Sequence, residues 1–187
     1  MKILAISGSL RADSLNTKLL HAAAELVDGE VEFEVWDGLK AVPPYDEDDE
    51  AGPPSIAVAR LRSAIADADA VLFATPEYNA SIPGQLKNAI DWVSRPVATN
   101  PLRNVPVAVI GASPGMFGAV WAQAELTKVV ALIGARVVEA ELPVAQAATR
   151  FDADGRLVDD ETREGLAQVV NQLVAAVVER QALQLAG

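Results

Sequence analysis

The chain of 187 residues contains no cysteine and a single histidine, His21. Without cysteine there are no disulfide bonds, thiolate metal sites or cysteine nucleophiles, and one histidine cannot build a histidine-based metal site. No apolar run approaches the roughly 18 residues that a transmembrane helix needs, and the N-terminus opens on a strand pattern and not on a signal peptide. We therefore expect a cytoplasmic protein with no metal site.

Basic and aromatic residues are also scarce. The chain has 15 Lys and Arg against 26 Asp and Glu, a formal net charge of -11, and 5% aromatic residues. Nucleic acid or an anionic membrane would need a basic surface, which this balance makes hard to assemble, so we expect neither as a partner. With 51% hydrophobic residues the composition is globular, and the length suits one domain over residues 1–187.

Short apolar runs alternate with amphipathic segments along the whole chain. This alternation predicts an α/β protein with a right-handed, doubly wound parallel sheet. The predicted strands are 2–6, 31–36, 70–75, 104–111 and 134–140, and the predicted helices are 15–27, 56–68, 85–93, 119–132 and 161–183.

The first strand runs directly into a polar loop and a helix, which is the arrangement of a phosphate site. Ser9, Arg11, Ser14 and Asn16 carry side-chain donors, and Ser14 stands where a helix N-cap belongs. Exposed N–H groups at such a helix start bind anions, and in an acidic chain Arg11 would have to supply the local positive charge. The spacing is neither a P-loop nor a Gly-x-Gly-x-x-Gly turn. A structural serine-rich helix cap is the alternative.

Two further loops follow the third and fourth predicted strands. The third strand leads into Pro76-Glu-Tyr-Asn79, and the fourth leads into 111–118, where Ser113, Gly115 and Gly118 could bring backbone close to a flat ring. Open parallel sheets bind ligands at the carboxyl ends of their strands, so we expect the three loops to converge. Taken alone, residues 76–79 could equally form an ordinary strand-ending turn.

The loop 8–16 resembles the flavin phosphate loop of the NAD(P)H-dependent FMN reductase family, which includes chromate and quinone reductases. The segment 75–92 is similar to the segment by which these enzymes hold the flavin ring. The resemblance extends along nearly the whole chain. It implies a flavodoxin-like three-layer sandwich, with a five-stranded parallel sheet in the order 2-1-3-4-5. It also implies FMN as cofactor and NAD(P)H as co-substrate.

The resemblance implies a role for each of the three loops in holding the cofactor. Backbone groups of 77–79 would bind the pyrimidine edge of the ring, and Tyr78 would lie against the ring. Pro114, Met116 and Phe117 stand where the family often has glycine. The implied cofactor-binding residues are Ser9, Leu10, Arg11, Ser14, Leu15, Asn16, Pro76, Glu77, Tyr78, Asn79, Ser113 and Gly115.

The sequence shows no nucleophile paired with a base, so we assign no catalytic side chain and expect the flavin to supply the chemistry. The predicted function is transfer of electrons from NAD(P)H through FMN to quinones, free flavins, azo compounds or metal ions such as chromate, by a ping-pong mechanism. A flavodoxin-like FMN electron carrier without NAD(P)H oxidation is the main alternative. A nucleotide-binding regulator without redox activity is a third.

The resemblance also implies a homodimer, or a dimer of dimers. The helix 85–93 would help form the interface, with Ile90 and Trp92 supplying exposed apolar surface. Trp36, Trp92 and Trp121 could contact the flavin, but each lies in a predicted regular element, so we favour their interpretation as core or interface residues.

Several charged residues are interpreted as surface features. The run 46–50 is acidic but lacks the spacing and the glycine of a calcium loop, so we expect a solvated loop. Arg60 and Arg62 are predicted to face water, and Lys87 and Asp91 to pair on a helix surface.

Overall fold

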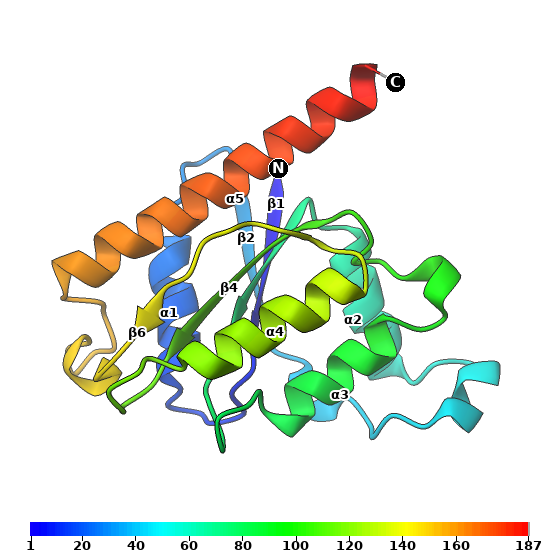
Figure 1. Cartoon of the computed structure of the whole chain (residues 1–187), viewed down its shortest axis with the longest axis horizontal. Coiled ribbons are helices and arrows are strands. Elements are labelled where there is room, and N and C mark those ends of the chain that lie inside the picture. The colour runs from blue at the N-terminus through cyan, green and yellow to red at the C-terminus, as the bar shows by residue number, and fades with distance from the viewer. Residues whose placement is uncertain (187) are drawn as a thin grey trace.

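A parallel sheet forms the centre of the computed structural model, which describes residues 1–186 (Figure 1). The strands lie in the order β2-β1-β3-β4-β5, which confirms the predicted flavodoxin-like α/β fold. All their pairings are parallel. The strands are β1 (Lys2–Ser7), β2 (Glu32–Trp36), β3 (Ala70–Ala74), β4 (Pro106–Ala112) and β5 (Arg136–Val137).

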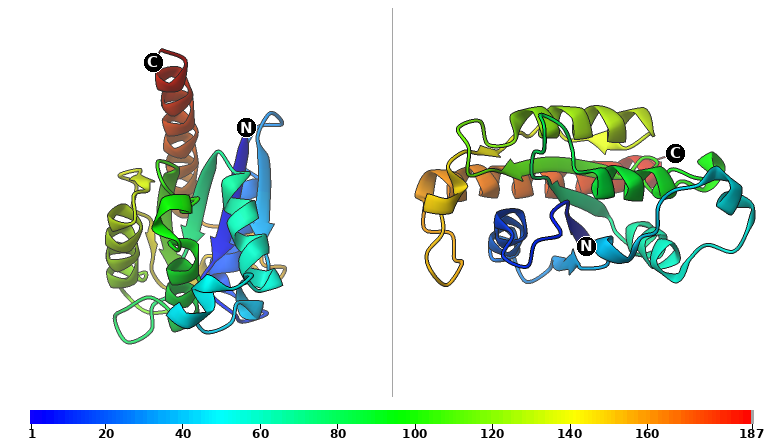
Figure 2. Two further views of the ribbon diagram at one scale, coloured as in Figure 1. Left: turned by 90° about the vertical axis from the view of Figure 1, so that its right-hand side faces the viewer. Right: turned by 90° about the horizontal axis from the view of Figure 1, so that it is seen from below.

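Helices cover both faces of the sheet, so the molecule has three layers (Figure 2). Helices α1 and α5 pack over one apolar core, and α2, α3 and α4 pack over the other. Strand β1 shows why the strands are apolar without interruption: Leu4 and Ile6 enter one core, and Ile3 and Ala5 enter the other. The helices are α1 (Leu15–Ala24), α2 (Ile56–Ala66), α3 (Gly84–Val93), α4 (Val120–Leu132) and α5 (Asp160–Ala186).

The predicted fifth strand, 134–140, is divided in the structure. After β5, the N–H of Ala140 donates to the carbonyl of Val138 (2.8 Å), a tight turn that takes the chain out of the sheet. The chain then returns as β6 (Pro143–Val144), which pairs with the carboxyl end of β4. The single predicted strand is therefore wrong, and two short segments accompany β4.

The side chain of Asp159 caps the start of the last helix. The Asp159 carboxylate accepts hydrogen bonds from the N–H and the hydroxyl of Thr162, at 2.9 and 2.6 Å, and pairs with Arg150 at 2.5 Å. Hydrogen bonds from Thr162 and then from Arg150 lower the pKa of Asp159 to about 2. This cap fixes the start of α5.

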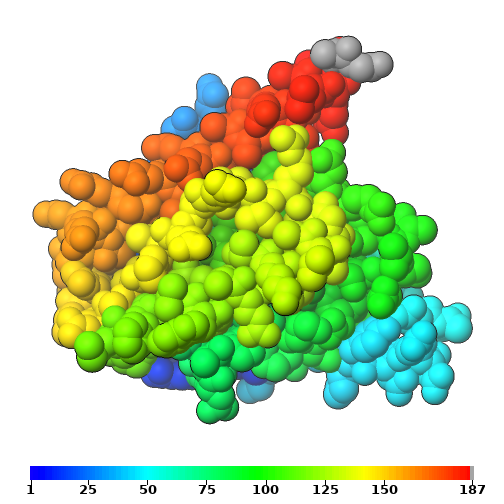
Figure 3. Space-filling model, in the orientation of Figure 1, coloured from blue at the N-terminus to red at the C-terminus, as the bar shows by residue number. Residues whose placement is uncertain are grey.

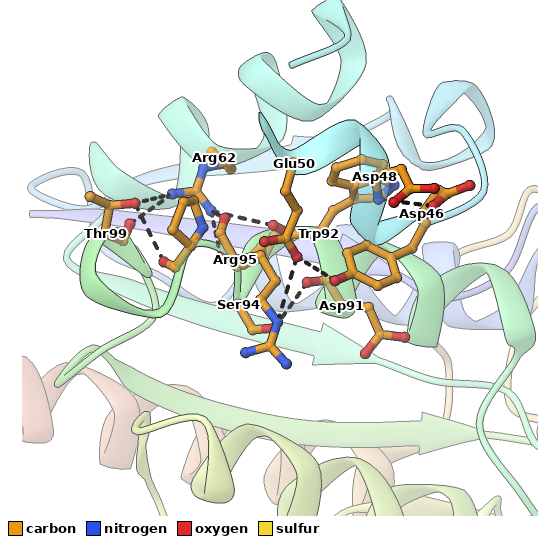
Figure 4. Close-up of polar contacts among 12 residues, drawn as sticks. Asp46, Asp48, Glu50, Arg62, Asp91, Trp92, Ser94, Arg95 and Thr99 are labelled. Carbon is orange, nitrogen blue, oxygen red and sulfur yellow. Dashed lines mark hydrogen bonds and ion pairs between the residues drawn. The ribbon is translucent and has the colours of Figure 1, made fainter. Parts of the chain in front are cut away.

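The acidic segment Asp46–Glu50 is exposed, as expected, but it is ordered and anchored. It forms most of a 3-10 helix, Glu47–Ala51, and projects from the body of the molecule (Figure 3). The Glu50 carboxylate accepts a hydrogen bond from the Tyr45 hydroxyl and lies 3.7 Å from Arg95, which follows α3 (Figure 4). The Tyr45–Glu50 hydrogen bond, with some desolvation, raises the pKa of Tyr45.

Arg62 was predicted to face water, but its side chain is bound within the protein. Its guanidinium donates to the carbonyls of Val93 (2.7 Å) and Thr99 (2.8 Å), and also to those of Trp92 and Arg95 (Figure 4). These carbonyls lie at the end of α3 and beyond, where a helix has no internal donors left. Burial lowers the pKa of Arg62. Arg60, on the same helix, is exposed.

We expect Arg62→Met to lower the free energy of unfolding by about 1.5 to 3 kcal/mol, because the carbonyls at the end of α3 lose a charged donor. Arg60→Met is the matched control and should change stability by less than about 0.5 kcal/mol. Urea unfolding of the two variants measures the difference. Equal losses would show that Arg62 does not hold the end of α3.

Candidate functional site

A cleft of about 220 Å³ opens at the carboxyl ends of β1, β3 and β4. The loops after these strands lie at the lower end of the molecule in Figure 1. The three predicted loops therefore converge, as parallel strands in this order require. The cleft is lined by Ser9, Arg11, Ser14, Leu15, Asn16, Pro76, Glu77, Tyr78, Ala112, Ser113 and Pro114.

The first wall of the cleft is the start of α1. The buried Ser14 caps the helix, and its hydroxyl accepts from the N–H of Thr17 at 3.2 Å. The backbone N–H groups of Ser14, Leu15 and Asn16 have no acceptor within the described residues. The exposed Arg11 side chain forms no ion pair within the same residues. Free N–H groups at a helix start beside an unpaired cation suit a phosphate group, so this wall fits FMN.

Asn16 ties the first wall to the third. Its side-chain amide donates to the carbonyl of Ala112 and accepts from the N–H of Ala112, both at 2.9 Å. The side chain is only 3% exposed, so its polar atoms are committed to the end of β4. The predicted Asn16 side-chain donor is therefore not free, and only the backbone N–H is left for a ligand.

The second wall is a turn after β3. The N–H and carbonyl of Tyr78 pair with Ser81 at 3.0 and 3.1 Å, while Asn79 and Ala80 adopt positive φ angles of 54° and 59°. The Tyr78 N–H is thus unavailable to a ring. The N–H groups of Glu77 and Asn79 have no acceptor in residues 1–186, so both remain available as donors. The Tyr78 side chain is 49% exposed at the opening of the cleft.

Glu77 joins the second wall to α4. Its carboxylate accepts from the N–H of Trp121 at 3.0 Å and from the N–H of Ala122 at 3.1 Å. The N-cap residue of α4, Ala119, supplies no side-chain cap and has a positive φ of 62°. A carboxylate 44 positions away in the sequence therefore performs the capping and neutralises the positive end of the helix.

The third wall follows β4. Ser113 accepts the N–H of Gly115 at 3.1 Å, which folds the loop back on itself. Gly118 has a φ of 58°, and a Cβ there would lie 2.4 Å from the Pro143 carbonyl carbon. Gly118 is therefore required for packing against β6 and does not open backbone to a ring. Met116 and Phe117 are exposed.

Most of the predicted cofactor-binding residues meet in the cleft, but three do not line it. Leu10 lies in a neighbouring hollow, Asn79 lies in the exposed turn, and Gly115 is an exposed residue of the loop after β4. The sequence analysis missed Ala112 and Pro114, which line the cleft because they flank Ser113 at the end of β4. The available signal was their position at the carboxyl end of a buried strand.

Two of the three tryptophans are buried and the third is exposed. Trp36 and Trp92 are each 6% exposed, and the indole N–H of Trp92 donates to the Pro43 carbonyl at 3.0 Å. Trp121 is 48% exposed and contacts Phe117 edge to face, with 4.9 Å between ring centroids. None of the three lines the cleft.

Comparison with known proteins gives one consistent result. The family model of NADPH-dependent FMN reductases matches residues 1–149. An NAD(P)H-dependent FMN reductase of Pseudomonas aeruginosa is 43% identical over 174 residues, covering 92% of this chain and 93% of the relative. A 2-hydroxy-1,4-benzoquinone reductase of a Burkholderia species is 38% identical and covers 96% of this chain and 98% of the relative.

A solved structure agrees with these relatives. FerB, a flavoenzyme NAD(P)H:(acceptor) oxidoreductase of Paracoccus denitrificans, superposes with a TM-score of 0.86 at 39% identity. The match covers 96% of this chain and 98% of the FerB chain.

We expect Arg11→Ala to weaken FMN binding about ten- to a hundredfold, because a charge-assisted hydrogen bond worth about 1.5 to 3 kcal/mol is lost. Fluorescence titration of the apoprotein with FMN measures the change. Arg156→Ala removes the same charge outside the cleft and should leave the affinity as it is. An unchanged titration curve for Arg11→Ala would remove this residue from the site.

Proposed function

The chain belongs to the NADPH-dependent FMN reductase family, and on that premise we propose that it reduces quinones with electrons from NAD(P)H. We extend the proposal to free flavins, azo compounds and chromate as further acceptors. The observation that supports it is the cleft, in which unpaired N–H groups, an unpaired arginine and an exposed tyrosine meet at the ends of three parallel strands.

The residues of the cleft position the cofactor and do not react. When bound, FMN accepts a hydride from NAD(P)H and passes electrons to the acceptor. The N–H groups of Ser14, Leu15 and Asn16, with Arg11, would hold the phosphate. The Glu77 carboxylate is engaged by the N–H groups of α4, so it is a structural anchor and not a general base.

In a single-domain protein, the nicotinamide and the acceptor would enter the same cleft one after the other. We propose that the chain is a single domain, so that the same cleft must admit the nicotinamide and the acceptor. Hydride transfer needs reacting atoms about 3 to 3.5 Å apart, so both partners cannot take that position together. We propose that oxidised nicotinamide leaves before the quinone enters.

This order predicts ping-pong kinetics. Initial rates measured with NADPH varied at several fixed quinone concentrations should give parallel double-reciprocal lines. Lines that intersect, without substrate inhibition to explain them, would demonstrate a ternary complex and contradict the shared opening.

The electron-carrier alternative makes a different prediction for the same protein. A carrier would bind FMN but would not consume NADPH. Mixing the FMN-loaded protein with NADPH and a benzoquinone should therefore lower absorbance at the nicotinamide band if the proposal is correct. No loss of absorbance under these conditions would favour the carrier.

We also propose a homodimer, or a dimer of two such dimers, but the expected contact residues need correction. Ile90 and Trp92 are 3% and 6% exposed, so they are already covered within one chain. A groove between α3 and α4 instead carries the exposed Val97 and Leu132 beside the Lys87–Asp91 pair, whose shortest distance is 2.6 Å. Apolar side chains rimmed by charges suit an interface between copies.

Light scattering at micromolar concentration tests this assembly. We expect at least the dimer mass, and we expect Leu132→Glu to shift the mass toward that of the monomer. A monomer mass for the unmodified protein would contradict the proposal.

Within residues 1–186, no helix combines the length and the apolar composition needed to cross a bilayer. The cytoplasmic location stays a prediction.

A further inference from the structure

A second hollow adjoins the cleft at the carboxyl ends of β1 and β2. This recess has a volume of about 350 Å³ and includes Arg11, His21, Asp37 and Lys40 among its lining residues. Ser9 and Arg11 line both the recess and the cleft, so the two hollows meet across the phosphate loop. The recess is large enough for part of a nucleotide.

Basic side chains without a partner line this recess. Most basic side chains of the acidic chain are paired or hydrogen-bonded: Lys2 and Lys18 bind carboxylates, for example, and Arg62 binds carbonyls. Within residues 1–186, the basic side chains without such a partner are Arg11, Lys40, Arg60, Lys128 and Arg156.

Two of these unpaired side chains, Arg11 and Lys40, share the recess with His21. A single carboxylate, that of Asp37, also lines the recess, and it forms no ion pair within the described residues. Cations left without partners in a protein of net charge -11 favour an anionic ligand.

The recess lies where the remainder of a pyridine nucleotide needs a site. The nicotinamide must enter the cleft, and the adenosine half of the molecule carries phosphate groups that need cations nearby. The opposite end of the cleft, residues 113–118, contains no basic residue and presents the exposed Met116 and Phe117. The recess supplies the charge and adjoins the cleft at Ser9 and Arg11.

We propose that the recess binds the phosphorylated adenosine half of NAD(P)H, with Lys40 contacting a phosphate group and Asp37 opposing it. This inference rests on the proposed function, because it assigns a site to part of the electron donor. It makes Lys40 a residue that determines affinity for the donor.

The test measures binding of adenosine 2′,5′-bisphosphate to the FMN-loaded protein by calorimetry. Lys40→Gln should weaken binding about tenfold, and Asp37→Asn should strengthen it, because a negative charge beside the phosphates is removed. A folding defect could not produce the second change. Lys128→Gln is the matched control, since it neutralises an unpaired lysine on α4 that lines no part of the recess.

Kinetics with two donors separates this inference from the proposed function. Reduced nicotinamide riboside lacks the adenosine half, so the ratio of kcat/KM for NADPH to kcat/KM for the riboside should fall about tenfold in Lys40→Gln. An unchanged ratio, or unchanged bisphosphate affinity in both recess variants, would overturn the inference while the enzyme remains a reductase. Failure of the unmodified protein to oxidise either donor would overturn the proposed function and this inference with it.

Discussion

Two side chains hold the walls of the cleft together. Asn16 joins the start of α1 to the end of β4 through two hydrogen bonds of 2.9 Å, and Glu77 joins the turn after β3 to the start of α4. The Asn16 contact satisfies the buried N–H and carbonyl of Ala112, where a lost partner costs about 1 to 3 kcal/mol. The Glu77 contact caps the first N–H groups of α4. The spacing of the three loops, and so the shape of the cofactor site, depends on these two contacts.

The negative net charge of the chain restricts where a phosphate group can bind. A chain with a net charge of -11 binds a phosphate only where backbone N–H groups and a few unpaired cations face the same hollow. Those conditions meet at Ser14 to Asn16 and at Arg11, while most other basic side chains are used within the protein. Lys40 extends the same positive region away from the cleft. The cofactor and the adenosine half of its electron donor are therefore expected on either side of one phosphate loop.

The fold could be predicted from the sequence because it depends on local hydrophobic patterns. Apolar runs buried on both faces predict parallel strands, and the strand order followed once the resemblance was recognised. The division of the fifth strand could not be predicted in this way, because it depends on a turn from Val138 to Ala140 that contains neither glycine nor proline. Long-range side-chain contacts were equally hidden: Arg62 reaches the end of α3, and Glu77 reaches α4, although each residue type usually faces water. The sequence predicted which loops meet but not which atoms in them are already paired.

A crystal structure of the protein with FMN tests the central claim most directly. We predict the phosphate among the N–H groups of Ser14, Leu15 and Asn16, and the ring between residues 76–79 and 113–115. The contacts of Asn16 and Glu77 should be unchanged, because they shape the cleft before the cofactor binds. A phosphate bound elsewhere, or walls that rearrange to break those two contacts, would contradict this account.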